Sequence, residues 1–260
     1  MSKKPLAIFT IVKDEPEFLP LWIRHYESQI GTQDDLFILD NQSTEKSVEY
    51  DTHRDSIIPV FNDEVNHAWM RDTVTKFQRF LMQSYEAVLF AEVDEFVFCR
   101  DGQSLHDYAQ WMVQDIVWCT GYEVVQQQDE PTLLHPVYGQ LLEKRSTWYR
   151  TSQYSKPLLT RIPVVWQLGF HDLDFVPAKT RIEDPNLLLV HLHKLDYGIA
   201  QSRHARFSSR KWAEADLRAG HGFQNRYTGD QLKSWFDQNV DAIGTPQPLE
   251  LIPDDVRRRL

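Results

Sequence analysis

The chain has 260 residues, about 42% of them apolar, and its 38 acidic and 28 basic side chains give a formal net charge of −10. This length and apolar share suit one large folded body and exclude a collagen, a coiled coil or a disordered tail. The negative charge argues against a nucleic-acid partner, because phosphate binding depends on clustered Lys and Arg. Cys99 and Cys119 are too few for a disulfide framework or a thiolate zinc site, so a cytoplasmic location is expected.

The first apolar run, residues 6–12, is followed at once by charged residues. It is far shorter than the roughly 20 apolar residues of a membrane span and has no small-residue cleavage site. No integral membrane segment is expected, so that any membrane association would be peripheral. The run predicts instead a buried first strand.

Apolar runs then alternate with segments of helical periodicity, up to the acidic residues near position 92. The predicted strands are 6–12, 36–39, 57–61 and 87–91, and the predicted helices are 14–30, with Gly31 as its C-cap, and 66–85. Strands alternating with helices in this way favour an α/β fold with a mostly parallel central sheet flanked by helices.

The second half of the chain is expected to complete this body and then to change character. Residues 115–166 are rich in Val, Trp, Tyr and Thr and predict further strands and loops, and 187–190 predict a last strong strand. Beyond residue 196 the pattern becomes polar and helical. The expected organisation is a catalytic domain over 1–195 and a helical C-terminal extension over 196–260 packed on it.

The sharpest chemical feature is a pair of carboxylates, Glu92 and Asp94, directly after the apolar run 87–91. Side chains alternate in extended backbone, so these two are expected to point to the same side. Crevices at the carboxyl ends of parallel strands hold ligands, and paired carboxylates suit Mg²⁺ or Mn²⁺. The alternative is an acidic strand end that is simply solvated.

Two imidazoles, His191 and His193, repeat this spacing after the strand predicted at 187–190. Nitrogen ligands suit transition metals better than Mg²⁺, so the combined set favours Mn²⁺ and leaves Mg²⁺ as the second candidate. The predicted metal ligands are Glu92, Asp94, His191 and His193. For either histidine, an ordinary core or surface role is the alternative.

Three segments in order, 11–15, 39–44 and 90–96, resemble the GT-A-fold glycosyltransferases, specifically the family 2-like and family 92-like branch whose acidic motif continues as D-E-F. The resemblance covers about residues 5–100 and, more loosely, Ser155-Lys156-Pro157, 169–172 and the strand at His191. It implies a GT-A fold and a nucleoside diphosphate sugar as the donor, with a UDP-sugar expected.

In that family, the first strand, its following loop and an Asp ending the second strand flank the nucleotide, and a D-x-D motif holds a divalent ion on the diphosphate. The resemblance therefore implies that Asp40 meets the base or ribose. At the metal motif, Glu92 stands in place of the first Asp. The donor-binding residues implied are Val12, Lys13, Asp14, Glu15, Asp40, Glu92 and Val93.

Other candidate residues complete the predicted site. Trp69 and Arg71 open the helix that leads to the ligand edge of the sheet, and they are expected to line the donor pocket. Lys156, which matches the family, is expected to stabilise the charge of the leaving group. Asp172 is the predicted general base with His171 lining the site. Arg161, Arg203, Arg206, Arg210 and Lys211 are further candidates for stabilising the charge of the leaving group, although the last four are expected to form a solvated helix face.

The expected function is metal-dependent transfer of a sugar to a hydroxyl of a glycan or lipid-linked acceptor, a reaction of polysaccharide biosynthesis catalysed by a hexosyltransferase. One alternative is a metal-dependent phosphoesterase or hydrolase, in which the same carboxylates and histidines activate water. The other is a glycan-binding module without catalysis, in which case ligand binding would be indifferent to metal.

Overall fold

The structure is a computed structural model, which describes residues 2–32, 34–44, 56–133, 136, 139–174, 180–241 and 243–260. Its strands are β1 (Lys4–Val12), β2 (Leu36–Asp40), β3 (Ile57–Pro59), β4 (Tyr85–Phe90), β5 (Glu95–Cys99), β6 (Ile116–Val125), β7 (Thr147–Arg150), β8 (Leu159–Thr160), β9 (Arg181–Lys194) and β10 (Glu250–Leu251). Its α-helices are α1 (Leu19–Ile30), α2 (His67–Leu81), α3 (Leu105–Trp111), α4 (Tyr197–Ser209), α5 (Glu214–Ala219), α6 (Gly229–Phe236) and α7 (Asp254–Arg257), and its 3₁₀ helices are η2 (Ser152–Tyr154) and η3 (Phe223–Arg226).

The predicted α/β fold class is confirmed. The strands β3, β2, β1 and β4 lie side by side in that order, and all pair in parallel. Beyond β4 the sheet continues through β8 and β6 to β7 and β10 by antiparallel pairs, while β9 pairs in parallel with β6 and antiparallel with β5. The carboxyl ends of β1, β2 and β4 therefore meet at one edge.

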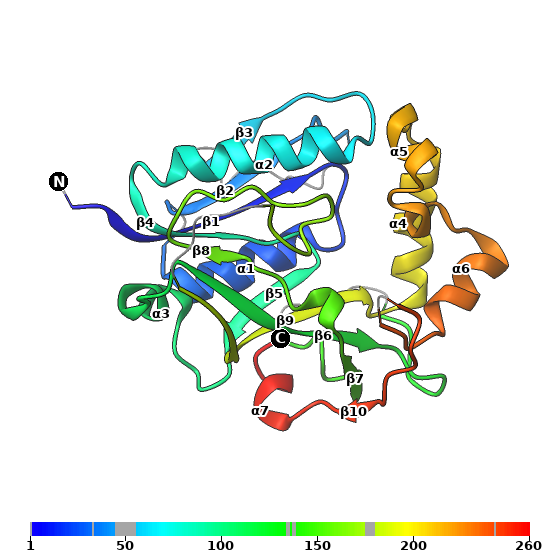
Figure 1. Ribbon diagram of the computed structural model, residues 1–260. Helices are drawn as coiled ribbons and strands as arrows, with labels where there is room; N and C mark the ends of the chain where they lie inside the picture. Colours follow the sequence, from blue (N-terminus) through cyan, green and yellow to red (C-terminus); the bar gives the residue numbers. More distant parts are fainter. Residues whose placement is uncertain are drawn as a thin grey trace.

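The two crossover helices cover opposite faces of the parallel strands (Figure 1). The chain moves from β1 to β2 through α1 and returns from β3 to β4 through α2. Right-handed crossovers running in opposite directions place their helices on opposite faces. On its face, α2 packs Phe77 against Phe9 of β1, with the ring centroids 5.2 Å apart. The strand order reverses between β1 and β4, which is where open α/β sheets form a ligand crevice.

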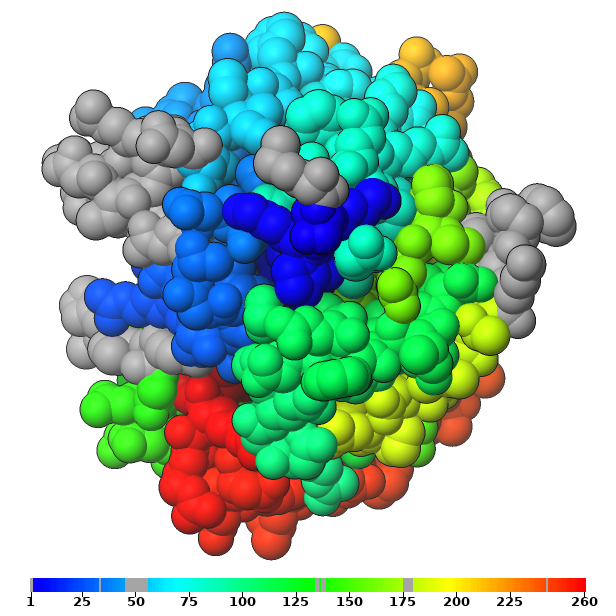
Figure 2. Space-filling model, turned by 90° about the vertical axis from the view of Figure 1, so that its left-hand side faces the viewer, coloured from blue at the N-terminus to red at the C-terminus, as the bar shows by residue number. Residues whose placement is uncertain are grey.

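The C-terminal residues, from α4 onward, pack beside the sheet, and the end of the chain contacts the N-terminal half. The helix α4 stands beside the carboxyl edge of the sheet, with α5 and α6 next to it (Figure 1). The red terminal segment adjoins the green residues around α3 (Figure 2). In this contact Arg259 donates to the carbonyl oxygens of Cys99 and Arg100. Within the described ranges, no helix has the length and apolar character needed to span a membrane.

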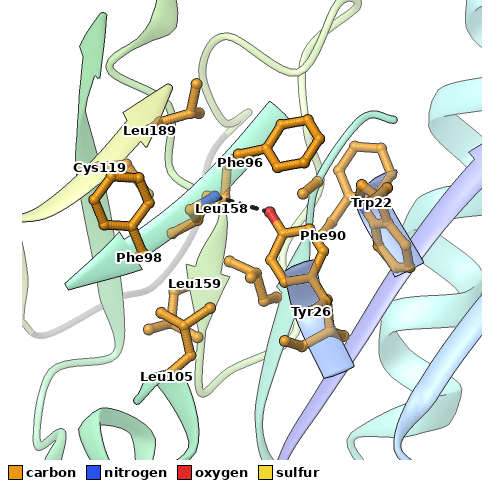
Figure 3. Close-up of a cluster of buried hydrophobic side chains, with 14 of the residues drawn as sticks. Trp22, Tyr26, Phe90, Phe96, Phe98, Leu105, Cys119, Leu158, Leu159 and Leu189 are labelled. Atoms are coloured by element: carbon orange, nitrogen blue, oxygen red, sulfur yellow. Dashed lines mark hydrogen bonds between the residues drawn. The ribbon is translucent and has the colours of Figure 1, made fainter. Parts of the chain in front are cut away.

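A buried aromatic cluster fixes the start of β5, immediately after the acidic residues (Figure 3). The Tyr26 hydroxyl of α1 accepts a hydrogen bond from the Val97 amide at 3.0 Å and donates one to the Glu95 carbonyl at 2.9 Å. Trp22 and Phe96 are fully buried around it. Paired buried polar groups avoid the cost of unmet hydrogen bonds, so Tyr26 holds β5 at a defined place against α1.

One predicted element begins at the wrong place. The helix expected from residue 14 begins at Leu19 and ends, as predicted, before Gly31. Asp14 has a left-handed φ of 52°, which is incompatible with a helical start. The acidic side chains of 14–17 are instead engaged by distant residues described below, so tertiary ion pairs override the local helix signal. The strands also differ in length from the prediction, since β3 is shorter and β9 much longer.

Candidate functional site

A cavity of about 310 Å³ opens where β1, β2 and β4 end. Its walls combine five parts of the chain: the loops that follow these strands, residues 63–70, the segment 153–171, the two histidines of β9, and the C-terminal residues 203–225. It brings together most of the residues singled out from the sequence. These are Val12, Lys13, Glu15, Trp69, Glu92, Val93, Asp94, Lys156, His171, His191 and His193.

The acidic residues of the cavity lie on a turn between β4 and β5. The Glu95 amide donates to the Glu92 carbonyl at 3.0 Å, and the Glu95 carboxylate accepts from the Glu92 amide at 2.9 Å. The prediction that Glu92 and Asp94 continue an extended strand is therefore wrong. The chain must reverse here to begin β5 against β9, and the turn sends the two side chains to different partners.

Glu92 and Glu95 share the buried ammonium of Lys156. The Lys156 Nζ lies 2.7 Å from Glu92 Oε2 and 2.6 Å from Glu95 Oε1. Burial alone would lower the pKa of Lys156, but the two carboxylates outweigh burial and raise it. Lys156 is therefore a fixed cation at the cavity wall, and the structure pairs Glu92 with this lysine rather than grouping it with the other predicted metal ligands.

Asp94, His191 and His193 form the one group of potential metal ligands found among the described residues. One ligand atom from each lies within 4.8 Å of the others. Asp94 and His191 are buried, and His191 Nε2 lies 3.7 Å from Asp94 Oδ2. Burial opposes ionisation of Asp94, but Arg203 and the histidines hold the pKa of this carboxyl well below its usual range. The group thus offers one carboxylate and two imidazoles, which are three of the four ligands predicted from the sequence, without Glu92.

A second carboxylate, Glu123 of β6, orients His191. Its Oε2 lies 2.6 Å from His191 Nδ1, and its Oε1 accepts from the Lys194 amide at 3.0 Å. Because a carboxylate accepts, Nδ1 carries a proton and Nε2 faces Asp94. Burial alone would lower the pKa of His191, but Glu123 and Asp94 outweigh it and raise the pKa. The stacked ring of Tyr154, 3.8 Å away between centroids, fixes the imidazole plane.

His193 is oriented by a third histidine. His204 of α4 directs Nδ1 at the Tyr227 carbonyl, 3.2 Å away, so this nitrogen is the donor. Its Nε2 is 3.1 Å from His193 Nε2, which must then donate. Burial lowers the pKa of both rings, for His204 to about 4. His193 is left neutral with its lone pair on Nδ1.

Arg203 of α4 joins the C-terminal segment to this centre. It donates to Asp94 Oδ2 at 2.6 Å and to both oxygens of Glu15 at 2.9 and 3.2 Å. Its side chain is buried, which alone would lower its pKa, but Asp94 and Glu15 outweigh burial and raise it. Burial raises the pKa of Glu15 even against Arg203. The guanidinium is therefore a permanent cation beside Asp94.

Two more arginines, Arg206 on the same helix face and Arg210 directly after the helix, pair with the loop after β1. Arg206 pairs with Glu17, and Arg210 lies 3.6 Å from Asp14 Oδ2 and donates to the Lys13 carbonyl. The expectation of a solvated helix face is wrong for these positions. Their spacing of three and four residues places them on one side of a helix, a signal that points to a common acidic partner.

Of the residues predicted around the nucleotide, two brace the loops rather than line the cavity. Asp40 Oδ1 accepts from the Ser43 amide and hydroxyl at 3.0 and 2.7 Å, and its neighbour Asn41 lines the cavity instead. Asp14 Oδ1 accepts from the Thr44 amide at 2.6 Å. Asp14 thus ties the loop after β1 to the loop after β2, and Asp40 braces the second loop from within. Lys13 and Glu15 lie on the cavity side.

Two other predicted residues also lie outside the cavity lining. Arg71 pairs with Asp72 at 2.7 Å, whereas Trp69, two residues earlier, lines the cavity and is half-buried. Asp172 is exposed, and its carboxylate accepts from the Leu173 amide at 2.8 Å. The preceding residue, His171, lines the cavity in its place.

No protein-family model matches the chain, and a comparison with curated proteins finds no relative. Among solved structures, S. aureus TarS 1-349 is 10% identical over 90% of this chain and 78% of its own, with a TM-score of 0.41. Its complex with UDP-GlcNAc is 10% identical over 87% and 70%, with a TM-score of 0.43. Mannosyltransferase PcManGT from Pyrobaculum calidifontis, in complex with GDP-Man and Mn²⁺, is 15% identical over 74% and 57%, with a TM-score of 0.39. At these identities the likeness concerns the fold alone.

Proposed function

We propose that this chain is a glycosyltransferase of the GT-A type, in the family 2-like or family 92-like branch, which transfers a sugar from a nucleoside diphosphate donor to a hydroxyl. The donor is a UDP-sugar and the acceptor a glycan or a lipid-linked sugar. Residues 1–195 form the body of its catalytic domain, and 196–260 a mostly helical extension that contributes Arg203 to the cavity wall and β10 to the sheet. The observation that carries the proposal is the meeting of Asp94, His191 and His193 with two buried cations at the ligand edge of the sheet.

The donor set fits a divalent cation of the Mn²⁺ type. A carboxylate and two imidazoles suit borderline metals better than Mg²⁺. The negative field that raises the pKa of His191 favours a metal cation in the same way as it favours a proton. Each imidazole is held by an outer partner, Glu123 or His204, as metal-binding histidines usually are. Asp94, His191 and His193 would hold the ion.

The chemistry requires stabilisation of a diphosphate that gains negative charge as its bond to the sugar breaks. A bound divalent ion supplies Lewis-acid stabilisation of that charge. Lys156 and Arg203 add fixed positive charge to the cavity wall, and their carboxylate partners hold them in place before the substrate arrives. Preorganised charges of this kind cost no reorganisation during the reaction. Trp69 and Val12 provide apolar surface toward the nucleoside side.

Calorimetry with UDP and GDP tests the proposal, each measured with Mn²⁺, with Mg²⁺ and with chelator. We expect binding that requires the metal, and the preferred nucleotide identifies the donor base. Binding of neither nucleotide in any condition would contradict the proposal and favour the hydrolase or the glycan-binding module. Release of phosphate from p-nitrophenyl phosphate without an acceptor would favour the hydrolase.

Glu123→Gln tests the orientation of His191. The Gln amide can donate to Nδ1, which would move the imidazole proton to Nε2 and remove the lone pair that faces Asp94. Loss of an outer partner typically lowers metal affinity about 10–100-fold. We expect a loss of this size in a Mn²⁺ titration, with Glu130→Gln as a matched control outside the cavity. Unchanged Mn²⁺ affinity in Glu123→Gln would contradict this role.

A further inference from the structure

His171 lies on the cavity wall, where one ring nitrogen is hydrogen-bonded and the other has no hydrogen-bond partner among the described residues. Its Nδ1 lies 2.7 Å from the Gln153 carbonyl, which can only accept, so Nδ1 carries the proton. The protein atoms packed around His171 and the charge of Lys156 lower the pKa of its imidazole to about 4. Part of the His171 surface is nevertheless exposed to solvent. At neutral pH the imidazole therefore has a lone pair on Nε2.

The backbone that presents His171 is strained. Gly169 and Phe170 both adopt left-handed conformations, with φ of 80° and 61°. Such a φ is a genuine outlier for a bulky aromatic residue and costs on the order of 1–3 kcal/mol. The Phe170 ring is buried against Phe90, 4.6 Å away between centroids, which offsets that cost. Strain of this kind gathers at functional sites, and here it sets the direction of the next residue.

We propose that His171 Nε2 takes the proton of the acceptor hydroxyl during transfer. This inference rests on the proposed function and assigns the proton acceptor within it. The hydroxyl oxygen forms a bond to the anomeric carbon, whose bond to the donor phosphate breaks with its electron pair on the nucleoside diphosphate. The hydroxyl proton moves to His171 Nε2. The exposed Asp172, predicted as the base from the sequence, has no such role.

The groups around His171 agree with this assignment. The charged side chains that act on it are Lys156, Glu92 and His191, and Tyr154 contacts both imidazoles, with centroids 6.3 Å from His171 and 3.8 Å from His191. Glu92, a carboxylate on the same wall, is already paired with Lys156. His171 is therefore a neutral proton acceptor. It lies beside residues 153–156, which also contact the metal-ligand group through Tyr154.

The test measures release of UDP or GDP from UDP-GlcNAc and GDP-Man, with methyl glucoside or water as the acceptor. A positioned general base contributes about 10²–10⁴-fold to rate. We expect His171→Gln and His171→Ala to lose that much release while nucleotide affinity by calorimetry stays within about twofold, and free imidazole to restore His171→Ala. Asp172→Asn is the matched control and should release nucleotide like the wild type.

A second variant moves the imidazole without removing it. A Cβ on Gly169 would lie 3.0 Å from His171 Cδ2, whereas one on Gly139, with a similar φ of 85°, would meet nothing within 4 Å. Gly169→Ala should therefore slow release, and Gly139→Ala should not. The inference would be overturned if His171→Gln released nucleotide at the wild-type rate, or if Asp172→Asn lost nucleotide release. Failure of the wild type to bind either nucleotide would instead contradict the proposed function.

Discussion

Asp94→Asn is expected to abolish metal-dependent nucleotide binding. The substitution keeps the size of the side chain but removes the only carboxylate of the group that contains His191 and His193. The nearby Arg203, 2.6 Å from Asp94 Oδ2, would then repel an incoming cation without a compensating charge. Loss of an outer-shell partner already costs about 10–100-fold in metal affinity, so loss of this ligand should exceed about 100-fold.

Mn²⁺ titration and UDP or GDP calorimetry measure this effect. Asp129→Asn, an exposed carboxylate outside the cavity lining, is the control for the general loss of one negative charge. Asp94→Asn should also remain folded, since Arg203 keeps its two contacts with Glu15. Nucleotide binding that persists in Asp94→Asn, equally strong with Mn²⁺ and with chelator, would contradict the metal site and would support the glycan-binding alternative, for which binding is indifferent to metal.

Arg203→Met is expected to destabilise the fold much more than the loss of Arg206 on the same helix. It leaves Glu15 and Asp94 buried without their shared cation, and removing one partner of a buried ion pair typically costs about 3–5 kcal/mol. The control is Arg206→Met, one turn along the helix. Its partner Glu17 is partly exposed, and a pair of that kind is worth about 1 kcal/mol or less.

The stability lost in Arg203→Met should also depend on pH, in a direction that follows from the pKa values of the two acids. In the wild type, Arg203 holds the pKa of Asp94 below its value in the unfolded chain, so this ionised carboxylate contributes stability at neutral pH that is lost only in strong acid. In Arg203→Met, burial is opposed only by the histidines beside Asp94 and by Arg206 near Glu15, so the pKa of both acids rises above its value in the wild type. The difference in unfolding free energy between wild type and variant should therefore narrow from pH 7 to pH 5. Equal losses at both pH values, or a loss no larger than that of Arg206→Met, would contradict the central role of Arg203.

The parallel half of the fold follows closely from the sequence. β1, β2 and β4 are short, continuous apolar runs that end in polar residues, and both crossover helices show clear periodicity. Such patterns reflect burial on both faces of a sheet, which is a local property. Since parallel strands share one carboxyl edge, the closeness of residues 12–15, 41 and 92–94 was also predictable.

The features that the sequence predicted wrongly, or did not indicate, depend on contacts with residues far along the chain. Asp14 and Glu15 carry a good helix-start pattern, yet the arginines of α4, about 190 residues later, draw these carboxylates away. Glu123 has no motif of its own and gains its role only because β6 pairs with β9. Local propensity is a weak prior in such places, since tertiary ion pairs and strand pairing decide the outcome.

The short connection between β9 and α4 limits how the C-terminal segment can be exchanged with that of another protein. Only Leu195 and Asp196 separate the two elements, and Asp196 caps α4 through the Gly198 and Ile199 amides while also holding Arg145. Insertion of a single residue within the helix, between this cap and Arg203, would rotate the part of α4 that carries the arginines by about 100° relative to the cap. All three arginines would then turn away from their acids. A chimera that borrows a foreign C-terminal segment must therefore preserve the spacing between Asp196 and Arg203 to keep a working centre.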